Sequence, residues 1–439
     1  MLKVELIPGR DILVKGKSNS LEVLVKVSTK KDYEREKHPR LPLNIGLALD
    51  RSGSMAGLPL EEAKKCAKML IDRMHESDRI SLVVFDGEVD VLAESQPVGD
   101  KVFLKSRVDS IEHRGMTALY DGWSVAADQI GNYANSKTLS RVLLLSDGCA
   151  NEGLTDLTRI SHECALQSRL GITTSTYGLG RHFNEALMTE MARHGEGMAH
   201  YGQSAEDLID PFTEEFDLIS SLIARKLKLR VRTEAGVRIE LLNDFRSDRF
   251  GQFLLPDLAE AGQAWAMFRI FIDPELCKNK VGTNLKILSA KVSCVDLDGH
   301  GQESEWANLS LKLSTADLVA EIPIQEEVNQ RSLELQAARI YDRARGAARA
   351  GDWDTVNQLM EDLKTLGKNN AWIDASIEKI NKYARERQQE FFAKEASYRS
   401  SKMRRRLTSN DEVSYSLRSE QMKPSYLRRK PEQGKHLGR

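Results

Sequence analysis

Residues 43–55 read Leu43-Asn44-Ile45-Gly46-Leu47-Ala48-Leu49-Asp50-Arg51-Ser52-Gly53-Ser54-Met55. The first seven residues form a short apolar run after a proline, which is typical of a buried parallel strand. Asp50 therefore lies at the carboxyl end of a strand, where open α/β sheets place their ligand sites. Asp50, Ser52 and Ser54 offer hard oxygen ligands, which suit Mg²⁺, Mn²⁺ or Ca²⁺ better than zinc or copper. We therefore predict a cation site here; the alternative is that Ser54 only caps the following helix.

Two later segments carry further oxygen ligands. Residues 114–122 form a glycine-hinged loop that contains Thr117 and leads into a helix, and residues 143–148 form a second apolar strand that ends in Asp147. In an open α/β sheet, the loops that follow parallel strands lie at one edge of the sheet. The set resembles the metal-ion-dependent adhesion site of von Willebrand factor type A (VWA) domains, and all five positions match: Asp50, Ser52, Ser54, Thr117 and Asp147.

The resemblance implies how these residues bind a cation. In this family the hydroxyls of Ser52, Ser54 and Thr117 would ligate directly, and the aspartates would act mainly through bound water. Neutral hydroxyls leave most of the cation's charge uncompensated, and Mg²⁺ keeps several waters where the protein supplies few ligands. A carboxylate from another molecule can displace one water and supply negative charge. We therefore expect Mg²⁺, or else Mn²⁺ or Ca²⁺, and a protein partner that presents an Asp or Glu.

A second stretch narrows the resemblance to a bacterial subgroup of the family. Residues 177–184, Tyr177-Gly178-Leu179-Gly180-Arg181-His182-Phe183-Asn184, and the following residues 185–188 look like proteins that are often labelled calcium-activated chloride channel homologues. The label implies a membrane channel, but no apolar run in this sequence approaches the length needed to cross a bilayer. The sequence therefore does not support a channel.

Composition indicates a cytoplasmic protein. The 64 basic and 65 acidic residues nearly balance, but basic residues predominate from Lys394 onward, which leaves the rest of the chain net acidic. The five cysteines are odd in number and widely spaced, which indicates reduced thiols rather than disulfides. The sequence shows no charged-then-apolar leader and no transmembrane segment.

Strands alternate with helices between residues 42 and 223, which predicts a doubly wound, Rossmann-like α/β domain. Residues 1–40 and 225–324 instead read as short β-strands separated by turns. We predict that these two segments form one β-sandwich into which the VWA domain is inserted. A chain of 439 residues is long enough for this organisation.

The remaining residues divide into a helical segment and a tail. Residues 325–399 show helical spacing and a stop-and-recap signal at Gly351-Asp352-Trp353, which predicts two or three antiparallel helices. These helices either cap the sandwich or form a separate binding surface. Residues 400–439 are rich in Arg, Lys and Ser, and we predict a disordered basic tail.

Thr408 in this tail is a candidate phosphorylation site. It follows Arg404-Arg405-Arg406-Leu407, which resembles the substrates of basophilic kinases. Asp411 lies three residues later and matches the preference of forkhead-associated domains for phosphothreonine. The alternatives are a capping box of Thr408 and Asp411, or a basic tail that contacts nucleic acid or a membrane.

These features favour a non-enzymatic, intracellular scaffold or adaptor that binds an acidic side chain through its cation. Its partners would include a Ser/Thr kinase, a phosphatase or a forkhead-associated-domain protein, and the resemblance places it in bacterial signalling. The rival hypotheses are a metal-assisted hydrolase and nucleic-acid or membrane contact through the tail. The sequence lacks a Walker motif, a nucleophile elbow and an H-E-x-x-H motif, which argues against an enzyme, and we do not expect nucleic-acid binding.

Overall fold

The computed structural model describes residues 2–29, 40–147, 150–180, 183–202, 206–409, 412 and 414–433, apart from the side chain of residue 206. The chain divides into two compact units. The described parts of residues 1–39 and 221–431 form the first unit, and those of residues 40–220 and 432–439 form the second. The second unit is therefore inserted into the first along the chain. No helix in the described ranges is long and apolar enough to cross a membrane.

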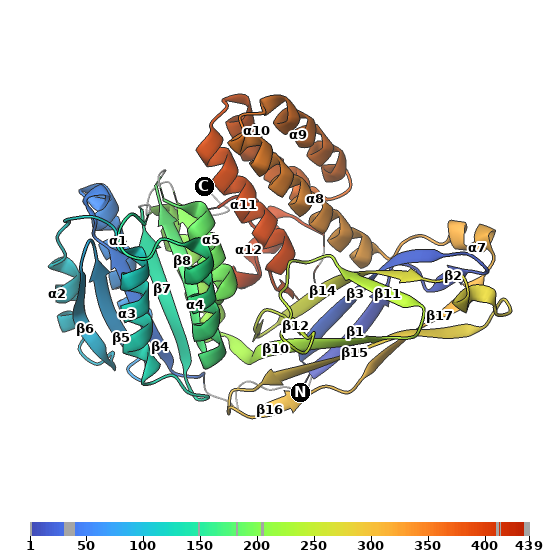
Figure 1. The fold of residues 1–439 in the computed structure, drawn as a ribbon, viewed down its shortest axis with the longest axis horizontal. Helices are drawn as coiled ribbons and strands as arrows, with labels where there is room; N and C mark the ends of the chain where they lie inside the picture. Colours follow the sequence, from blue (N-terminus) through green and yellow to red (C-terminus); the bar gives the residue numbers. More distant parts are fainter. Residues whose placement is uncertain are drawn as a thin grey trace. The chain divides into compact units, whose positions relative to one another are not determined.

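The second unit is the α/β fold that the sequence predicts (Figure 1). Its sheet has the strand order β6-β5-β4-β7-β8-β9, and all neighbouring pairs are parallel except β5 and β6. Its strands are β4 (Leu43–Asp50), β5 (Arg79–Phe85), β6 (Val89–Pro97), β7 (Leu139–Ser146), β8 (Ile172–Leu179) and β9 (Glu196–Gly202). Its helices are α1 (Leu58–Arg73), α2 (Lys101–Asp109), α3 (Leu119–Gly131), α4 (Leu157–Leu170), α5 (Glu185–His194) and α6 (Glu206–Ser220).

Helices cover both faces of this sheet. Helices α3, α4 and α5 pack on one face, where Trp123 and Ile130 of α3 join a buried apolar cluster with Phe85. Helix α6 lies on the other face beside α1, and Phe212 of α6 stacks on Tyr177 of β8 with ring centroids 3.8 Å apart. Because both faces are covered, every residue of β4 and of β7 is buried.

Strand order fixes one edge of this sheet as the place for a ligand. The chain starts at β4 in the centre, builds outward through β5 and β6, and then returns to build β7, β8 and β9 on the other side. The reversal falls between β4 and β7, and doubly wound folds bind ligands at the carboxyl ends of strands at such a point. The register places Asp50 opposite Phe85 and Leu49 opposite Leu145, so these strands end level with one another.

The first unit contains two β-sheets. One sheet has the order β1-β3-β14-β11, with β18 also paired to β14, and the other has the order β12-β10-β15-β17-β2, with β13 and β16 at its margins. Strand β1 contacts β15 and β17 of the second sheet, so the sheets pack face to face. The strands are β1 (Leu2–Pro8), β2 (Ile12–Val14), β3 (Asn19–Thr29), β10 (Leu222–Thr233), β11 (Val237–Leu241), β12 (Phe253–Leu254), β13 (Leu258–Ala259), β14 (Gly262–Ile272), β15 (Asn284–Val295), β16 (Gly301–Glu303), β17 (Ala307–Ser314) and β18 (Thr408–Ser409).

The N-terminal strands find their partners far along the chain. Residues 21–27 of β3 pair with residues 264–270 of β14 in antiparallel register, and β1 pairs with β3. Alternate residues of β3, such as Val23 and Val25, are fully buried. Because the entropy cost of loop closure grows only slowly with loop length, a long insertion between two paired strands is tolerated.

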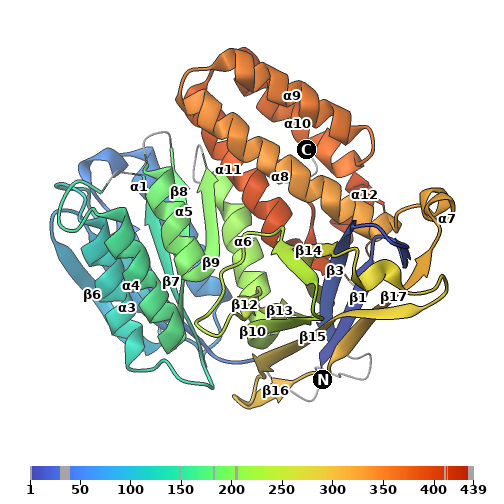
Figure 2. The same ribbon diagram turned by 45° about the vertical axis from the view of Figure 1, so that its right-hand side comes forward.

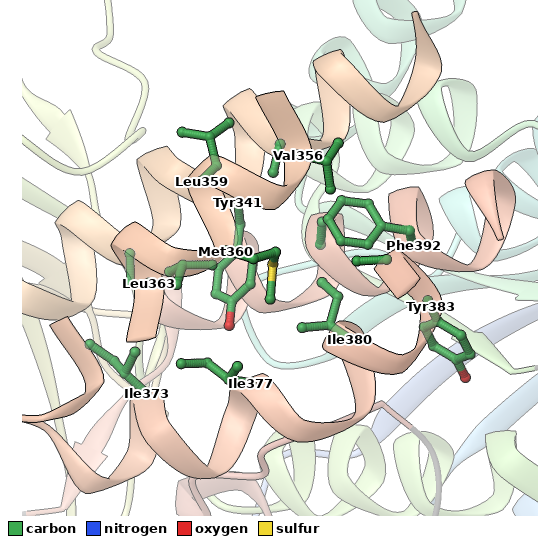
Figure 3. Close-up of a cluster of buried hydrophobic side chains, with 14 of the residues drawn as sticks. Tyr341, Val356, Leu359, Met360, Leu363, Ile373, Ile377, Ile380, Tyr383 and Phe392 are labelled. Atoms are coloured by element: carbon green, nitrogen blue, oxygen red, sulfur yellow. The ribbon is translucent and has the colours of Figure 1, made fainter. Parts of the chain in front are cut away.

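Four long helices follow the sheets, where the sequence predicts two or three (Figure 2). Short helix α7 (Ala316–Glu321) precedes α8 (Glu326–Arg349), α9 (Trp353–Gly367), α10 (Ala371–Arg385) and α11 (Gln389–Arg405). Figure 3 shows their shared core, in which Tyr341, Met360, Ile380 and Phe392 converge from all four helices. The prediction of two or three helices is wrong because α10 ends at Arg385 and a fourth helix, α11, begins at Gln389, within the predicted segment.

The predicted disorder of residues 400–439 is also wrong for the described residues of this tail. Helix α11 runs to Arg405, β18 pairs with the start of β14, and α12 (Leu417–Gln421) follows. Basic composition does not prevent packing here, because buried carboxylates neutralise the arginines. Arg331 pairs with Glu334 and Glu412, and Arg406 also pairs with Glu412, at 2.7 Å.

Aromatic side chains also bond the C-terminal segment, by which we mean the described residues after Arg405. The indole nitrogen of Trp265 donates to the carbonyl oxygen of Arg406 at 3.0 Å, and that of Trp372 donates to Lys430 at 3.2 Å. Thr408 is 3% exposed, and its hydroxyl lies 3.5 Å from the carbonyl oxygen of Gln263. Phosphorylation of Thr408 stays a prediction, and it would require β18 to leave β14. Asp411, the other half of the predicted motif, lies outside the described residues.

Candidate metal site

Asp50 is the most deeply buried residue of the candidate site. Its side chain is fully buried at the end of β4 and accepts hydrogen bonds from the backbone N–H of Ser52 at 2.8 Å and from the hydroxyl of Ser146 at 2.5 Å. Burial raises the pKa of Asp50 to about 6, and the nearby negative charge of Asp147 adds to this rise. The ionised carboxylate therefore needs a positive charge beside it.

A short 3₁₀ turn, Gly53–Met55, follows β4 closely; Ser52 directly precedes this turn and Ser54 lies within it. Their hydroxyl oxygens lie 3.1 Å apart, and the hydroxyl of Ser54 donates to Asp147 at 2.8 Å. Neither serine caps a helix, since helix α1 begins after Gly57 without any side-chain cap. The alternative prediction of Ser54 as a helix cap is therefore wrong, because three residues separate Ser54 from the start of α1 and Gly57 is its N-cap residue.

Thr117 reaches the site on a separate loop. The backbone N–H of Gly53 donates to the carbonyl oxygen of Gly115 at 3.2 Å, which holds this loop beside the serine turn. On the other side, the N–H of Thr117 donates to the side chain of Asn151 at 2.9 Å. Thr117 is buried at 3% exposure. Hydrogen bonds thus join Asp50, Ser52, Ser54 and Asp147 into one chain, and backbone contacts bring the loop of Thr117 alongside.

Asp86 is a site residue that the sequence analysis missed. It directly follows β5 and is almost completely buried. One oxygen of its carboxylate accepts from the guanidinium groups of Arg51 and Arg114, each at 2.7 Å. Its carbonyl oxygen accepts from the N–H of Ala118 at 2.7 Å. Asp86 therefore connects the serine turn, through Arg51, with the loop of Thr117, through Arg114 and Ala118.

The electrostatics of Asp86 differ from those of Asp50. Burial by itself would raise the pKa of Asp86, but the hydrogen bonds from Arg114, Glu88 and Arg51 lower it below the ordinary value. Arg51 also pairs with Asp90. The sequence held a signal for this residue, because Asp86 follows an apolar strand just as Asp50 does.

The residues present fit a hard divalent cation. Two carboxylates and two serine hydroxyls meet at one point of the sheet edge, and the two arginines of the adjoining loops direct their guanidinium groups to Asp86. An oxygen-only donor set of this kind suits Mg²⁺, Mn²⁺ or Ca²⁺. A bound cation would also remove the repulsion between Asp50 and Asp147 that contributes to the raised pKa of Asp50.

A second group of potential ligands has a structural explanation. Among the described residues, Asp296, Asp298 and His300 lie close enough together to hold a cation. The side chain of Asp296 accepts from the backbone N–H groups of Asp298 and His300, at 3.0 and 2.8 Å. These hydrogen bonds close the turn between β15 and β16. The role of Asp296 in this group is therefore to stabilise the turn.

Comparison with known proteins identifies the α/β unit. Residues 44–214 match the model of the von Willebrand factor type A domain, so the chain contains a VWA domain. An uncharacterised protein of Synechocystis sp. is 30% identical over 191 residues, which are 44% of each chain. The chain spans less than half the length of the curated relatives that it matches first.

Two solved structures share the fold over most of the chain. The von Willebrand factor type A protein from Catenulispora acidiphila aligns with a TM-score of 0.68 at 17% identity and covers 88% of this chain and 89% of its own. The ArnB paralog VWA2 from Sulfolobus acidocaldarius aligns with a TM-score of 0.62 at 17% identity, over 92% and 98%. At this identity the likeness extends to the fold alone. VWA domains are commonly metal-dependent modules of protein interaction.

Proposed function

We propose that Asp50, Ser52, Ser54, Thr117 and Asp147 hold a divalent cation, Mg²⁺ first of all, and that this cation binds a carboxylate of a protein partner. The observation that carries the proposal is the chain of hydrogen bonds from Ser146 through Asp50, Ser52 and Ser54 to Asp147. This chain lies at the carboxyl ends of β4 and β7, where the strand order reverses. The protein then acts as a scaffold or adaptor rather than as an enzyme.

The donor set explains why a partner's carboxylate would bind. Serine and threonine hydroxyls carry no formal charge, so a cation among them keeps much of its positive charge. When bound, the cation supplies a point of attachment for an acidic side chain and keeps an exchangeable water there. Ser54 lies at the exposed side of the site, whereas Asp50 lies below it, fully buried. The open side of the site is therefore the side of Ser54.

Metal binding is tested by unfolding with and without Mg²⁺. At a Mg²⁺ concentration of one hundred times the dissociation constant, the wild type should gain about 2.7 kcal/mol of stability. Ser54→Ala should lose this gain without disturbing the fold, because Ser54 is exposed and, within the described part of the chain, its side chain bonds only Ser52 and Asp147. Ser106→Ala on α2 is the matched control, since this exposed serine bonds its own helix. A wild type that gains nothing from Mg²⁺, Mn²⁺ or Ca²⁺ refutes the cation.

Partner binding is tested by capture of proteins from the native cell with and without EDTA. We expect one or more partners to be lost in EDTA and to be lost equally with Thr117→Ala. Thr408→Ala should retain them, because Thr408 lies in the other unit of the chain. Recovery of the same partners under all of these conditions would contradict the metal bridge.

A further inference from the structure

The exposed residues around the candidate metal site define the kind of partner that fits it. Three loops meet there: the loop after β5, the loop that carries Thr117, and the loop that follows β7. The rim of the site, as we use the term, consists of five of the exposed side chains in these loops: Glu88, Glu112, Arg114, Met116 and Glu152.

Hydrogen bonds place two of the glutamates against the loop of Thr117. Arg114 of this loop donates to the carboxylate of Glu88 at 3.1 Å. The backbone N–H of Glu152 donates to the carbonyl oxygen of Thr117 at 3.3 Å. Glu112 lies on the same loop. The rim therefore holds glutamates on both sides of Thr117.

The rim is net acidic. Its one cation, Arg114, already pairs with Asp86, Glu88 and Asp90. The side chain of Glu88 is nevertheless 79% exposed, so its charge faces the solvent above the pair. Three glutamates against one arginine make the electrostatic potential at the rim negative. A cation bound in the site would by contrast attract a carboxylate.

Apolar side chains stand beside these charges. Met116, directly before Thr117, is 50% exposed, and Leu58 at the start of α1 is 65% exposed. A Cβ atom on Gly87 would lie 3.8 Å from the Cβ of Met116, so Met116 lies beside the loop after β5. A partner that reaches the cation therefore meets exposed apolar surface as well as glutamates.

We infer that the site selects a protein segment that presents a single Asp or Glu within basic and apolar surroundings. The inference rests on the proposed function. A lone carboxylate gains the cation, whereas neighbouring carboxylates would face Glu88, Glu112 and Glu152. Like charges brought together at an interface disfavour a partner, and opposite charges on the rim speed its association. Lysines beside the acidic residue would pair with the glutamates, and leucines would cover Met116 and Leu58.

Three synthetic peptides of equal length test this selection. The first has one aspartate between lysines and leucines, the second has the same aspartate between glutamates, and the third replaces the aspartate of the first by asparagine. All are acetylated and amidated, so that no terminal carboxylate competes for the cation. Binding to the full chain is measured by fluorescence anisotropy in Mg²⁺ and in EDTA.

We expect the first peptide to bind in Mg²⁺ at least about tenfold more tightly than the second, a difference of about 1.4 kcal/mol. EDTA and the asparagine peptide should both abolish the binding. The triple variant Glu88→Gln, Glu112→Gln, Glu152→Gln should bring the two aspartate peptides to nearly equal affinity. Glu275→Gln should change nothing, since this equally exposed glutamate lies in the other unit. Raising the salt to about 1 M, where the Debye length is about 3 Å, should also reduce the difference.

The other outcomes separate the two proposals. If the glutamate-flanked peptide binds as tightly as the lysine-flanked one and EDTA releases both, the metal bridge stands and the selection by the rim is refuted. If the lysine-flanked peptide binds equally well in EDTA or with asparagine in place of aspartate, the rim attracts charge without a metal bridge, and the proposed function fails at this surface. If no peptide binds in Mg²⁺, both proposals fail.

Discussion

At the scale of single residues, aspartates at the ends of neighbouring strands take different roles. Asp50 meets hydroxyls and a backbone N–H, so burial raises its pKa and leaves its charge for a cation. Asp86 meets two arginines, so its charge is already neutralised and its pKa falls. The first is suited to hold a metal, and the second is suited to position the loops that do.

Asp86→Asn should weaken Mg²⁺ binding by about tenfold, equivalent to about 1.4 kcal/mol. An amide cannot balance the charges of both Arg51 and Arg114, so the serine turn and the loop of Thr117 lose their common anchor. Isothermal titration calorimetry measures the affinity. Asp90→Asn is the control, because its half-exposed carboxylate contacts the same arginines and should matter less. Unchanged Mg²⁺ affinity in a folded Asp86→Asn variant would show that Asp86 only stabilises the fold.

At the scale of elements, helix α6 is held to the sheet by one buried carboxylate. Glu215 of α6 accepts hydrogen bonds from Arg141 of β7 and from Ser175 of β8, the latter at 2.7 Å. His200 of β9 lies 3.5 Å away. Burial by itself would raise the pKa of Glu215, but these neighbours lower it to about 2. A single residue thus links α6 to three strands.

The pH dependence of stability follows from Glu215. Because its folded pKa of about 2 lies below the ordinary 4.5, its contribution is complete above pH 4.5 and is lost as the pH falls toward 2. A shift of this size corresponds to about 3 kcal/mol. Glu215→Gln should therefore be less stable at neutral pH, and its stability should fall less steeply between pH 4.5 and 2. Urea unfolding across this range checks the prediction, and parallel curves for the two proteins would contradict it.

At the scale of the whole molecule, the C-terminal segment connects the sheets of the first unit to its helices. Glu412 pairs with Arg331 of α8 and with Arg406 and Arg429 of the segment itself. Glu420 adds a second pair to Arg429, at 2.7 Å. These charges are almost entirely buried, so each depends on the others.

Glu412→Gln should destabilise the first unit by about 3–5 kcal/mol, because it leaves three buried arginines short of negative charge. Tryptophan fluorescence during urea unfolding reports on this unit through Trp265 and Trp372, which bond the segment. The stabilisation by Mg²⁺ should persist, since the cation site lies in the other unit. Glu378→Gln on the surface of α10 should stay within about 0.5 kcal/mol of the wild type. A Glu412→Gln variant as stable as this control would show that the buried ion pairs of Glu412 do not stabilise the first unit.

The sequence by itself determined the doubly wound fold, because apolar strands and amphipathic helices are visible in local spacing. It also indicated Asp50, Ser52 and Ser54, since a turn directly after a strand places them together. Tertiary structure alone revealed Asp86 as an anchor, because its arginine partners come from two other loops. It alone ordered the C-terminal segment as well. Arg331 and Glu412 lie 81 residues apart, so the basic tail seemed to lack the neutralising charges that folding brings to it.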